Sequence, residues 1–103
     1  MKNKRLKEPE SIFIEYFGNS SQVRILDFLI DGIGFDYTLD ELARGSKVKW
    51  ETFVNIWKKL LDKDIVILSR VKRNNKYFTL NRKNEFVKSI LKLDLELIKM
   101  EME

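Results

Sequence analysis

The sequence predicts a mainly α-helical domain with one small β-hairpin, an α+β fold. Apolar residues recur at helical spacing in several segments, which favours amphipathic helices. Two short stretches rich in β-favouring residues, 65–71 and 77–80, are separated by a polar turn, as in a hairpin. With 103 residues, of which 44% are hydrophobic, the chain provides for one hydrophobic core and not two.

Two helices are expected in the first third of the chain. Residues 11–17 (SIFIEYF) are dense in large apolar groups and end at Gly18, which predicts a short buried helix. The polar run at 19–21 offers N-caps for an amphipathic helix that continues to residue 31 and stops at Gly32-Ile33-Gly34. This Gly-x-Gly lacks the third glycine and the preceding strand of a nucleotide-binding loop, so we interpret it as a turn.

A pair of helices follows a short extended stretch at residues 35–37. Thr38-Leu39-Asp40-Glu41 is a capping box, which predicts a helix over residues 39–44 that ends at Gly45. After a turn at 46–49, residues 50–63 carry an apolar stripe at helical spacing, made of Phe53, Ile56, Trp57, Leu60 and Leu61.

The hairpin turn is predicted at residues 72–76, because the adjacent Asn74 and Asn75 tolerate left-handed backbone conformations. Asn81 is then expected to cap a final helix from Arg82 to about Met102. This helix carries a seam with 4-3-4-3 spacing, typical of a coiled coil: Phe86, Ile90, Leu93, Leu97 and Met100. A flanking row adds Val87, Leu91, Leu95 and Ile98.

The charge is unevenly distributed, although the net charge is only +4. Residues 1–7 hold four bases and no acid, and residues 8–43 hold eight acids against one base, Arg24. Residues 44–83 hold twelve bases against three acids, and residues 84–103 return to a small negative charge. A cationic middle of this kind is expected where a polyanion docks, although charged surfaces can also serve solvation alone.

Several classes of protein are disfavoured by composition. The chain has no cysteine and no histidine, so we expect no disulfide, no soft-metal site, no cofactor and no thiol or imidazole catalysis. No apolar run reaches the length of a membrane span, and no signal peptide is evident, which predicts a cytoplasmic, nucleoid-associated protein. An enzyme is the weakest functional hypothesis.

The order of elements resembles the winged helix-turn-helix proteins, specifically small archaeal or bacterial transcriptional regulators of the ArsR and MarR type. The resemblance covers about residues 10–100 and is carried mainly by the stretches TLDELARGS (38–46) and WKKLLDKDIV (57–66). It implies a winged helix-turn-helix domain at 10–81 and a C-terminal helix at 82–103. It also implies that helix 50–63 reads the major groove and that the basic turn 72–76 contacts the backbone or the minor groove. A flexible basic tail is expected at 1–9, because residues 1–7 are polar and like-charged and end near Pro9, the only proline.

The residues themselves support a DNA interface. Lys49, Thr52 and Asn55 can offer hydrogen bonds to base edges, and asparagine suits adenine. Cations that would contact phosphates are Lys47, Lys58, Lys59, Lys72, Arg73 and Lys76. Lys58 and Lys59 can equally form the solvated side of the helix, and Glu51 would repel phosphates. Trp50 and Trp57 could stack on bases, but Trp57 lies on the apolar stripe and is expected in the core.

A homodimer is expected because two recognition helices, about 34 Å apart, would read two half-sites. The seam residues Phe86, Ile90, Leu93, Leu97 and Met100 would pack against their symmetry mates, with help from Ile12, Phe13 and Tyr16. The alternative is that the seam packs back on helix 20–31 of its own chain. Both arrangements can hold together, with the inner row on its own domain and the outer row on the partner. The leading hypothesis is thus a dimeric, sequence-specific regulator of transcription. An architectural DNA-binding protein and a winged-helix protein-interaction module remain the alternatives, and the sequence leaves any small-molecule effector unknown.

Overall fold

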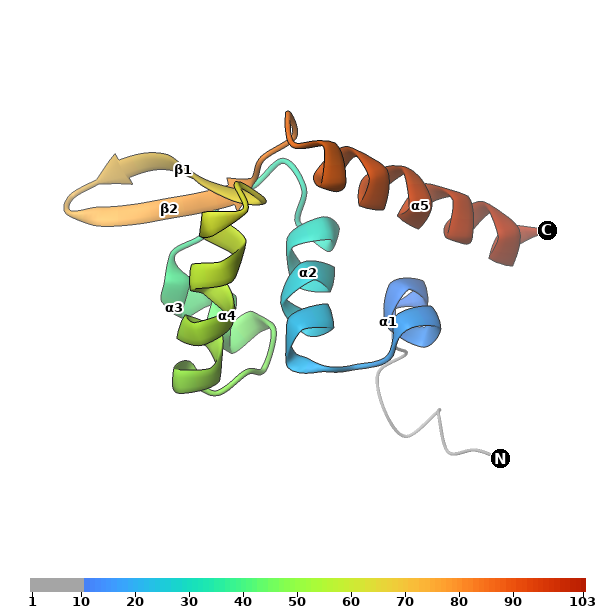
Figure 1. Ribbon diagram of the computed structural model, residues 1–103, viewed down its shortest axis with the longest axis horizontal. Coiled ribbons are helices and arrows are strands. Elements are labelled where there is room, and N and C mark those ends of the chain that lie inside the picture. The colour runs from blue at the N-terminus through green and yellow to red at the C-terminus, as the bar shows by residue number, and fades with distance from the viewer. Residues whose placement is uncertain (1–10) are drawn as a thin grey trace.

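The computed structural model describes residues 11–103, so the predicted basic tail at 1–9 lies outside the described residues. Helices and one antiparallel two-stranded sheet follow each other as α1 (Ile12–Phe17), α2 (Ser21–Asp31), α3 (Leu39–Gly45), α4 (Trp50–Asp62), β1 (Val66–Lys72), β2 (Asn75–Leu80) and α5 (Glu85–Met102) (Figure 1). The predicted α+β class is therefore confirmed. Within residues 11–103, no helix combines the length and the apolar character needed to cross a membrane.

Side-chain caps set where the first three helices begin. The Ser11 hydroxyl accepts from the amide of Ile14, and the Ser20 hydroxyl accepts from the amide of Val23. Thr38 and Glu41 form the predicted capping box, in which each side chain accepts a hydrogen bond from the other's backbone amide. These starts agree with the sequence because a cap is a local interaction within four residues.

Two helices end on left-handed residues that are not glycine. Asp64, with φ of 58°, follows α4, and the amides of Ile65 and Asp64 donate to the carbonyls of Leu60 and Leu61, each at 3.0 Å. Lys47, with φ of 60°, ends α3 in the same way. This pairing is the Schellman motif, which closes the last turn of a helix and redirects the chain.

The hairpin turn is shorter than predicted. The two residues with positive φ are Arg73 (51°) and Asn74 (69°), as a two-residue type I′ turn requires, and Asn75 already pairs with Lys72 in the sheet. The register shifts between Leu68 and Arg70, where the strand bulges. The extended stretch expected at 35–37 contributes a single bridge, from Tyr37 to Phe78.

The final helix begins later than predicted, because Asn84 caps it and Asn81 does not. The side-chain oxygen of Asn84 accepts from the amide of Val87, and its amide group donates to the carbonyls of Lys63 and Asp64. The Asn81 side chain also donates to the carbonyl of Asp64. Both asparagines therefore bind the chain before α5 to the end of α4, a long-range contact that no local pattern reveals.

The core lies between α2, α4, the hairpin and the first turns of α5. Its largest fully buried side chains are Ile25, Leu42, Phe53, Val66 and Val87. α2 contacts α3 and α4 as well as α1, while α5 leads away from the hairpin and contacts α1 (Figure 1).

Candidate nucleic-acid interface

All nine predicted DNA-contact residues are exposed. They lie on three segments: Lys47 and Lys49 in the α3–α4 turn, four residues on α4, and Lys72, Arg73 and Lys76 at the tip of the hairpin. The hairpin projects from the helical part of the molecule on the side where α3 and α4 lie (Figure 1). The fold thus brings the three segments to one end of the molecule.

The outward face of α4 is polar but not uniformly cationic. Phe53, Trp57 and Leu60 are buried, which turns the opposite row, Glu51, Asn55, Lys58 and Asp62, towards solvent. Thr52 and Lys59 flank this row and are also exposed. Acids at both ends of the row leave Asn55 and Lys58 as its central groups, so the positive charge of this region comes mainly from the turn and the hairpin.

The three cations at the hairpin tip form no salt bridge with an acidic residue of the described chain. Within residues 11–103, salt bridges join Arg44 to Asp40, Arg70 to Asp36 and Lys88 to Glu85, and none involves Lys72, Arg73 or Lys76. Arg73 and Asn74 both adopt left-handed backbone conformations, so the chain reverses direction within these two residues. Three unpaired positive charges therefore cluster on a short, projecting turn.

Arg70, two pairs before the hairpin turn, does form an ion pair, and this pair stabilises the strand. Its guanidinium donates to both carboxylate oxygens of Asp36, at 2.9 and 3.2 Å, and lies 4.0 Å from the centre of the Tyr77 ring. The Arg70 and Ser69 hydrogen bonds lower the pKa of Asp36. This pairing fixes the bulged part of β1 against the segment that precedes α3.

Arg24, on α2, holds the α3–α4 turn, a role that sequence reasoning missed. Its Nε donates to the carbonyl of Ser46 at 3.0 Å and its Nη2 to the carbonyl of Lys47 at 3.2 Å. These carbonyls are left free by the end of α3, and the arginine satisfies both. The only signal in the sequence is that Arg24 is the single base among the acids of residues 8–43.

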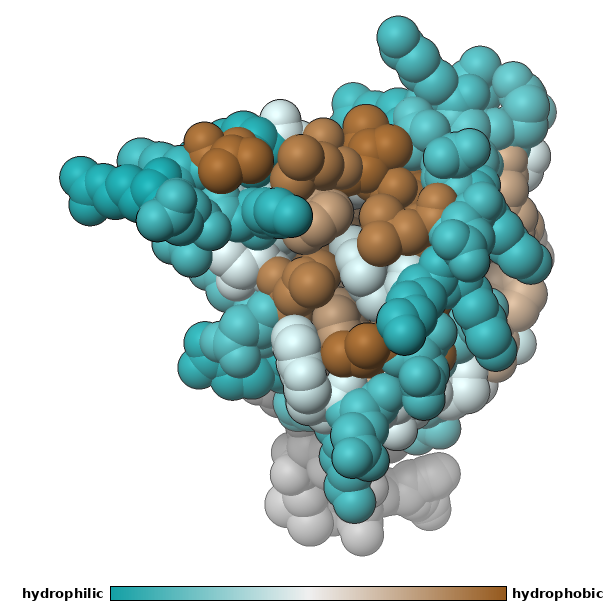
Figure 2. All heavy atoms as spheres, turned by 60° about the vertical axis from the view of Figure 1, so that its left-hand side comes forward, coloured by the Kyte–Doolittle hydropathy of each residue, from teal (hydrophilic) through white to brown (hydrophobic). Residues whose placement is uncertain are grey.

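Apolar side chains lie beside these polar groups. Trp50, Leu61, Leu68 and Val71 are exposed, Leu61 despite its place on the predicted buried stripe. In Figure 2, hydrophobic side chains form a band next to the hydrophilic projecting end of the molecule. Trp57 is in the core, as predicted, where it stacks on Phe53 and meets the edge of Phe78.

The structure divides the predicted dimer seam into two sets. Ile90 and Leu97 form an inner row that is buried within its own chain, at 8% and 6% exposure. Phe86, Leu93 and Met100, spaced by seven residues, form one exposed row. From α1, Phe13 is buried, and the exposed Tyr16 donates its hydroxyl to Glu101 at 3.0 Å.

The part of the chain that the structure describes contains no group of three acidic side chains close enough to hold a metal ion. Comparisons with protein-family models and with curated protein sequences give no match. The three exposed segments are therefore the features of this chain that point to a function.

Proposed function

We propose that the protein is a dimeric, sequence-specific regulator of transcription that binds double-stranded DNA as a winged helix-turn-helix. In this proposal α3 and α4 form the helix-turn-helix and the β1–β2 hairpin is the wing. The observation that carries it is that one end of the molecule presents the polar row of α4 together with the unpaired cations of the hairpin tip.

Each segment has a separate task on the duplex. α4 enters the major groove, where the Asn55 amide can form two hydrogen bonds with adenine and the Thr52 hydroxyl can reach a neighbouring base. Lys49 can donate to a base edge, while Lys47, Lys58 and Lys59 contact phosphates, which supplies affinity without sequence information. Arg73 reaches the backbone or the minor groove from the tip of the wing.

The second copy associates through the exposed row of α5, Phe86, Leu93 and Met100. A two-fold axis would place the two α4 helices about 34 Å apart, one turn of DNA. An isologous contact uses the same row from both chains, so a single exposed stripe is sufficient.

The test measures duplex affinity as a function of salt for two variants that each lose three positive charges. One replaces Lys72, Arg73 and Lys76 by alanine, and the other replaces Lys88, Lys92 and Lys99 on α5. Each phosphate contact contributes about 0.9 to the slope of log affinity against log salt, so the first variant loses up to about 3 from that slope. The second variant keeps the wild-type slope. Equal effects of the two variants would contradict the proposed wing.

Asn55→Ala separates the regulator from an architectural DNA-binding protein. For a sequence-specific protein, discrimination at one base pair falls by about 1 to 3 kcal/mol, while the salt slope is unchanged. For an architectural protein, Asn55→Ala has no effect on any duplex, whereas Arg73→Ala weakens binding to all of them.

The apolar surface formed by Trp50, Leu61, Leu68 and Val71 favours a second candidate function, a protein-interaction module. Its apolar surface and the neighbouring cations would then meet an acidic protein. That function predicts no duplex binding even near about 50 mM salt, where a cationic DNA-binding domain binds most strongly.

A further inference from the structure

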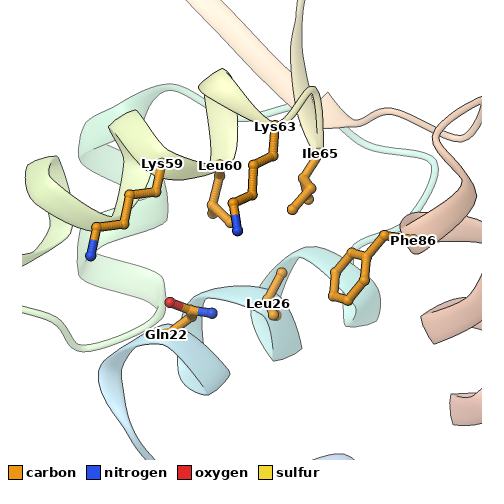
Figure 3. A pocket seen from close by; sticks show the side chains of 7 residues that line it. All are labelled: Gln22, Leu26, Lys59, Leu60, Lys63, Ile65 and Phe86. Atoms are coloured by element: carbon orange, nitrogen blue, oxygen red, sulfur yellow. The ribbon is translucent and has the colours of Figure 1, made fainter.

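A groove of about 290 Å³ lies between α2, α4 and the start of α5, away from the hairpin tip (Figure 3). Leu26, Leu60 and Ile65, all buried, line its apolar part. The half-exposed ring of Phe86 closes one end (Figure 3). The volume lies near the lower end of the range of small-molecule sites, about 300 to 1,000 Å³.

The opening of the groove is cationic. Lys59 on α4 and Lys63 directly after it extend their side chains along the opening, and the Gln22 amide lies opposite on α2 (Figure 3). No acidic residue lines the groove, and neither lysine takes part in a salt bridge within residues 11–103. Two ammonium groups beside an aliphatic surface complement an anion with an apolar body.

We propose that this groove binds a small carboxylate with an aliphatic chain. The carboxylate pairs with Lys59 and Lys63, whose charge-assisted hydrogen bonds fix its position. The chain then covers Leu26, Leu60 and Ile65 and contacts the ring of Phe86, which removes apolar surface from water. A phosphate-rich ligand fits less well, because aliphatic side chains would occupy the place of further donors.

The site does not depend on DNA binding. It shares Lys59 with the proposed phosphate contacts and Phe86 with the proposed dimer row, but Asn55, Lys58, the hairpin tip, Leu93 and Met100 lie outside it. A failure of one proposal therefore leaves the other intact.

The experiment titrates the isotopically labelled full chain with octanoate and follows the backbone amide signals by NMR. We expect saturable shifts centred on Leu26, Leu60, Ile65 and Phe86. Octan-1-ol, which has the same chain length without the charge, should bind at least about fivefold more weakly.

Two variants with equal charge loss test the role of the lysines. Lys59→Gln with Lys63→Gln should weaken octanoate binding by about fivefold or more and leave octan-1-ol binding unchanged. Lys58→Gln with Lys92→Gln, which changes exposed lysines outside the groove, should leave octanoate binding at the wild-type level. The proposal is overturned if both variants lose octanoate equally, or if the shifts centre on the exposed row at Leu93 and Met100 instead.

Discussion

The two ends of the molecule differ in how completely one chain buries its apolar residues. At the α3–α4 end, the rings of Phe53, Trp57 and Phe78 form a continuous series, with centroid distances of 5.3 and 5.6 Å, and Phe53 has no exposed surface. At the α1–α5 end, Phe17 and Met100 are about half exposed, at 48% and 58%. The ring series is buried within one chain, although Trp50 and Leu68 near it are about half exposed, whereas Phe17 and Met100 belong to apolar surface that another copy can cover.

The ends also differ in charge. Three aspartates, Asp27 and Asp31 on α2 and Asp94 on α5, lie close enough for charge repulsion: Asp31 acts on Asp27, and both act on Asp94. Burial and the Asp31 charge raise the pKa of Asp27, against the hydrogen bond from Ser11, and burial raises the pKa of Asp94. These aspartates would repel DNA, whereas the hairpin tip at the opposite end carries three cations without a salt bridge, so we expect a polyanion to approach from the hairpin end.

The largest effect on stability is expected in the buried ring series of Phe53, Trp57 and Phe78. Phe53→Ala should lower the free energy of unfolding by about 3 to 5 kcal/mol, because it removes a fully buried ring between two other rings. Urea unfolding of the variant and the wild type measures the difference. A loss below about 1 kcal/mol would mean that this end is loosely packed.

The double substitution Leu93→Glu with Met100→Glu tests whether a second copy covers the exposed row of α5. Both residues are exposed in one chain, so the variant should fold but lose the dimer, with the dissociation constant raised about 100-fold or more by the buried charges. Analytical ultracentrifugation should show the mass fall to that of one chain, 12.3 kDa. A wild-type protein that is already monomeric would show that no second copy covers the apolar surface at the α1–α5 end.

Gly45→Ala tests how closely α3 approaches α2. A Cβ at this position would overlap the ring of Phe28, and we expect a loss of about 1 to 3 kcal/mol despite the better helix propensity of alanine. Adding Phe28→Leu should restore part of the stability by making room. Equal unfolding midpoints for Gly45→Ala and the wild type would show that the helices can separate at little cost.

The smallest effect is expected from Asp27→Asn. The folded state binds the Asp27 proton more tightly than the unfolded chain does, so stability falls as the pH rises from the ordinary pKa of 3.8 to the raised pKa of the folded state. Asparagine keeps an oxygen for the Ser11 hydroxyl and removes this loss. Because water screens the partly exposed aspartates, the gain at neutral pH should be below about 1 kcal/mol. Urea unfolding over this pH range should show that the free energy of unfolding of the variant falls less steeply with pH than that of the wild type. Some dependence should remain, because the pKa of Asp94 is also raised. An unchanged slope would contradict the assignment to Asp27.

Local patterns predicted most of the fold. The capping box at Thr38, the glycine after α1 and the β-favouring stretches act over a few residues, so the helices and the hairpin lie where expected. The exposure of the nine predicted DNA-contact residues also followed from helical periodicity and from the polar turn.

Long-range contacts account for what the sequence did not reveal. Arg24 reaches a turn more than twenty residues away, and Asn84 displaces the start of α5 by bonding to the end of α4. The seam of α5 looked uniform because its spacing is regular, yet contact with the rest of the chain buries Ile90 and Leu97 and leaves Leu93 exposed. Such differences depend on which element packs on which face.

The most direct test of the proposed function is a selection from random DNA duplexes. The protein is mixed with the pool at near-physiological salt, because any cationic domain binds DNA when salt is low. The bound duplexes are then recovered and sequenced. A dimeric reader should enrich an inverted repeat whose half-sites are about ten base pairs apart. A bound pool without enrichment, or no bound pool, would contradict sequence-specific recognition by α4.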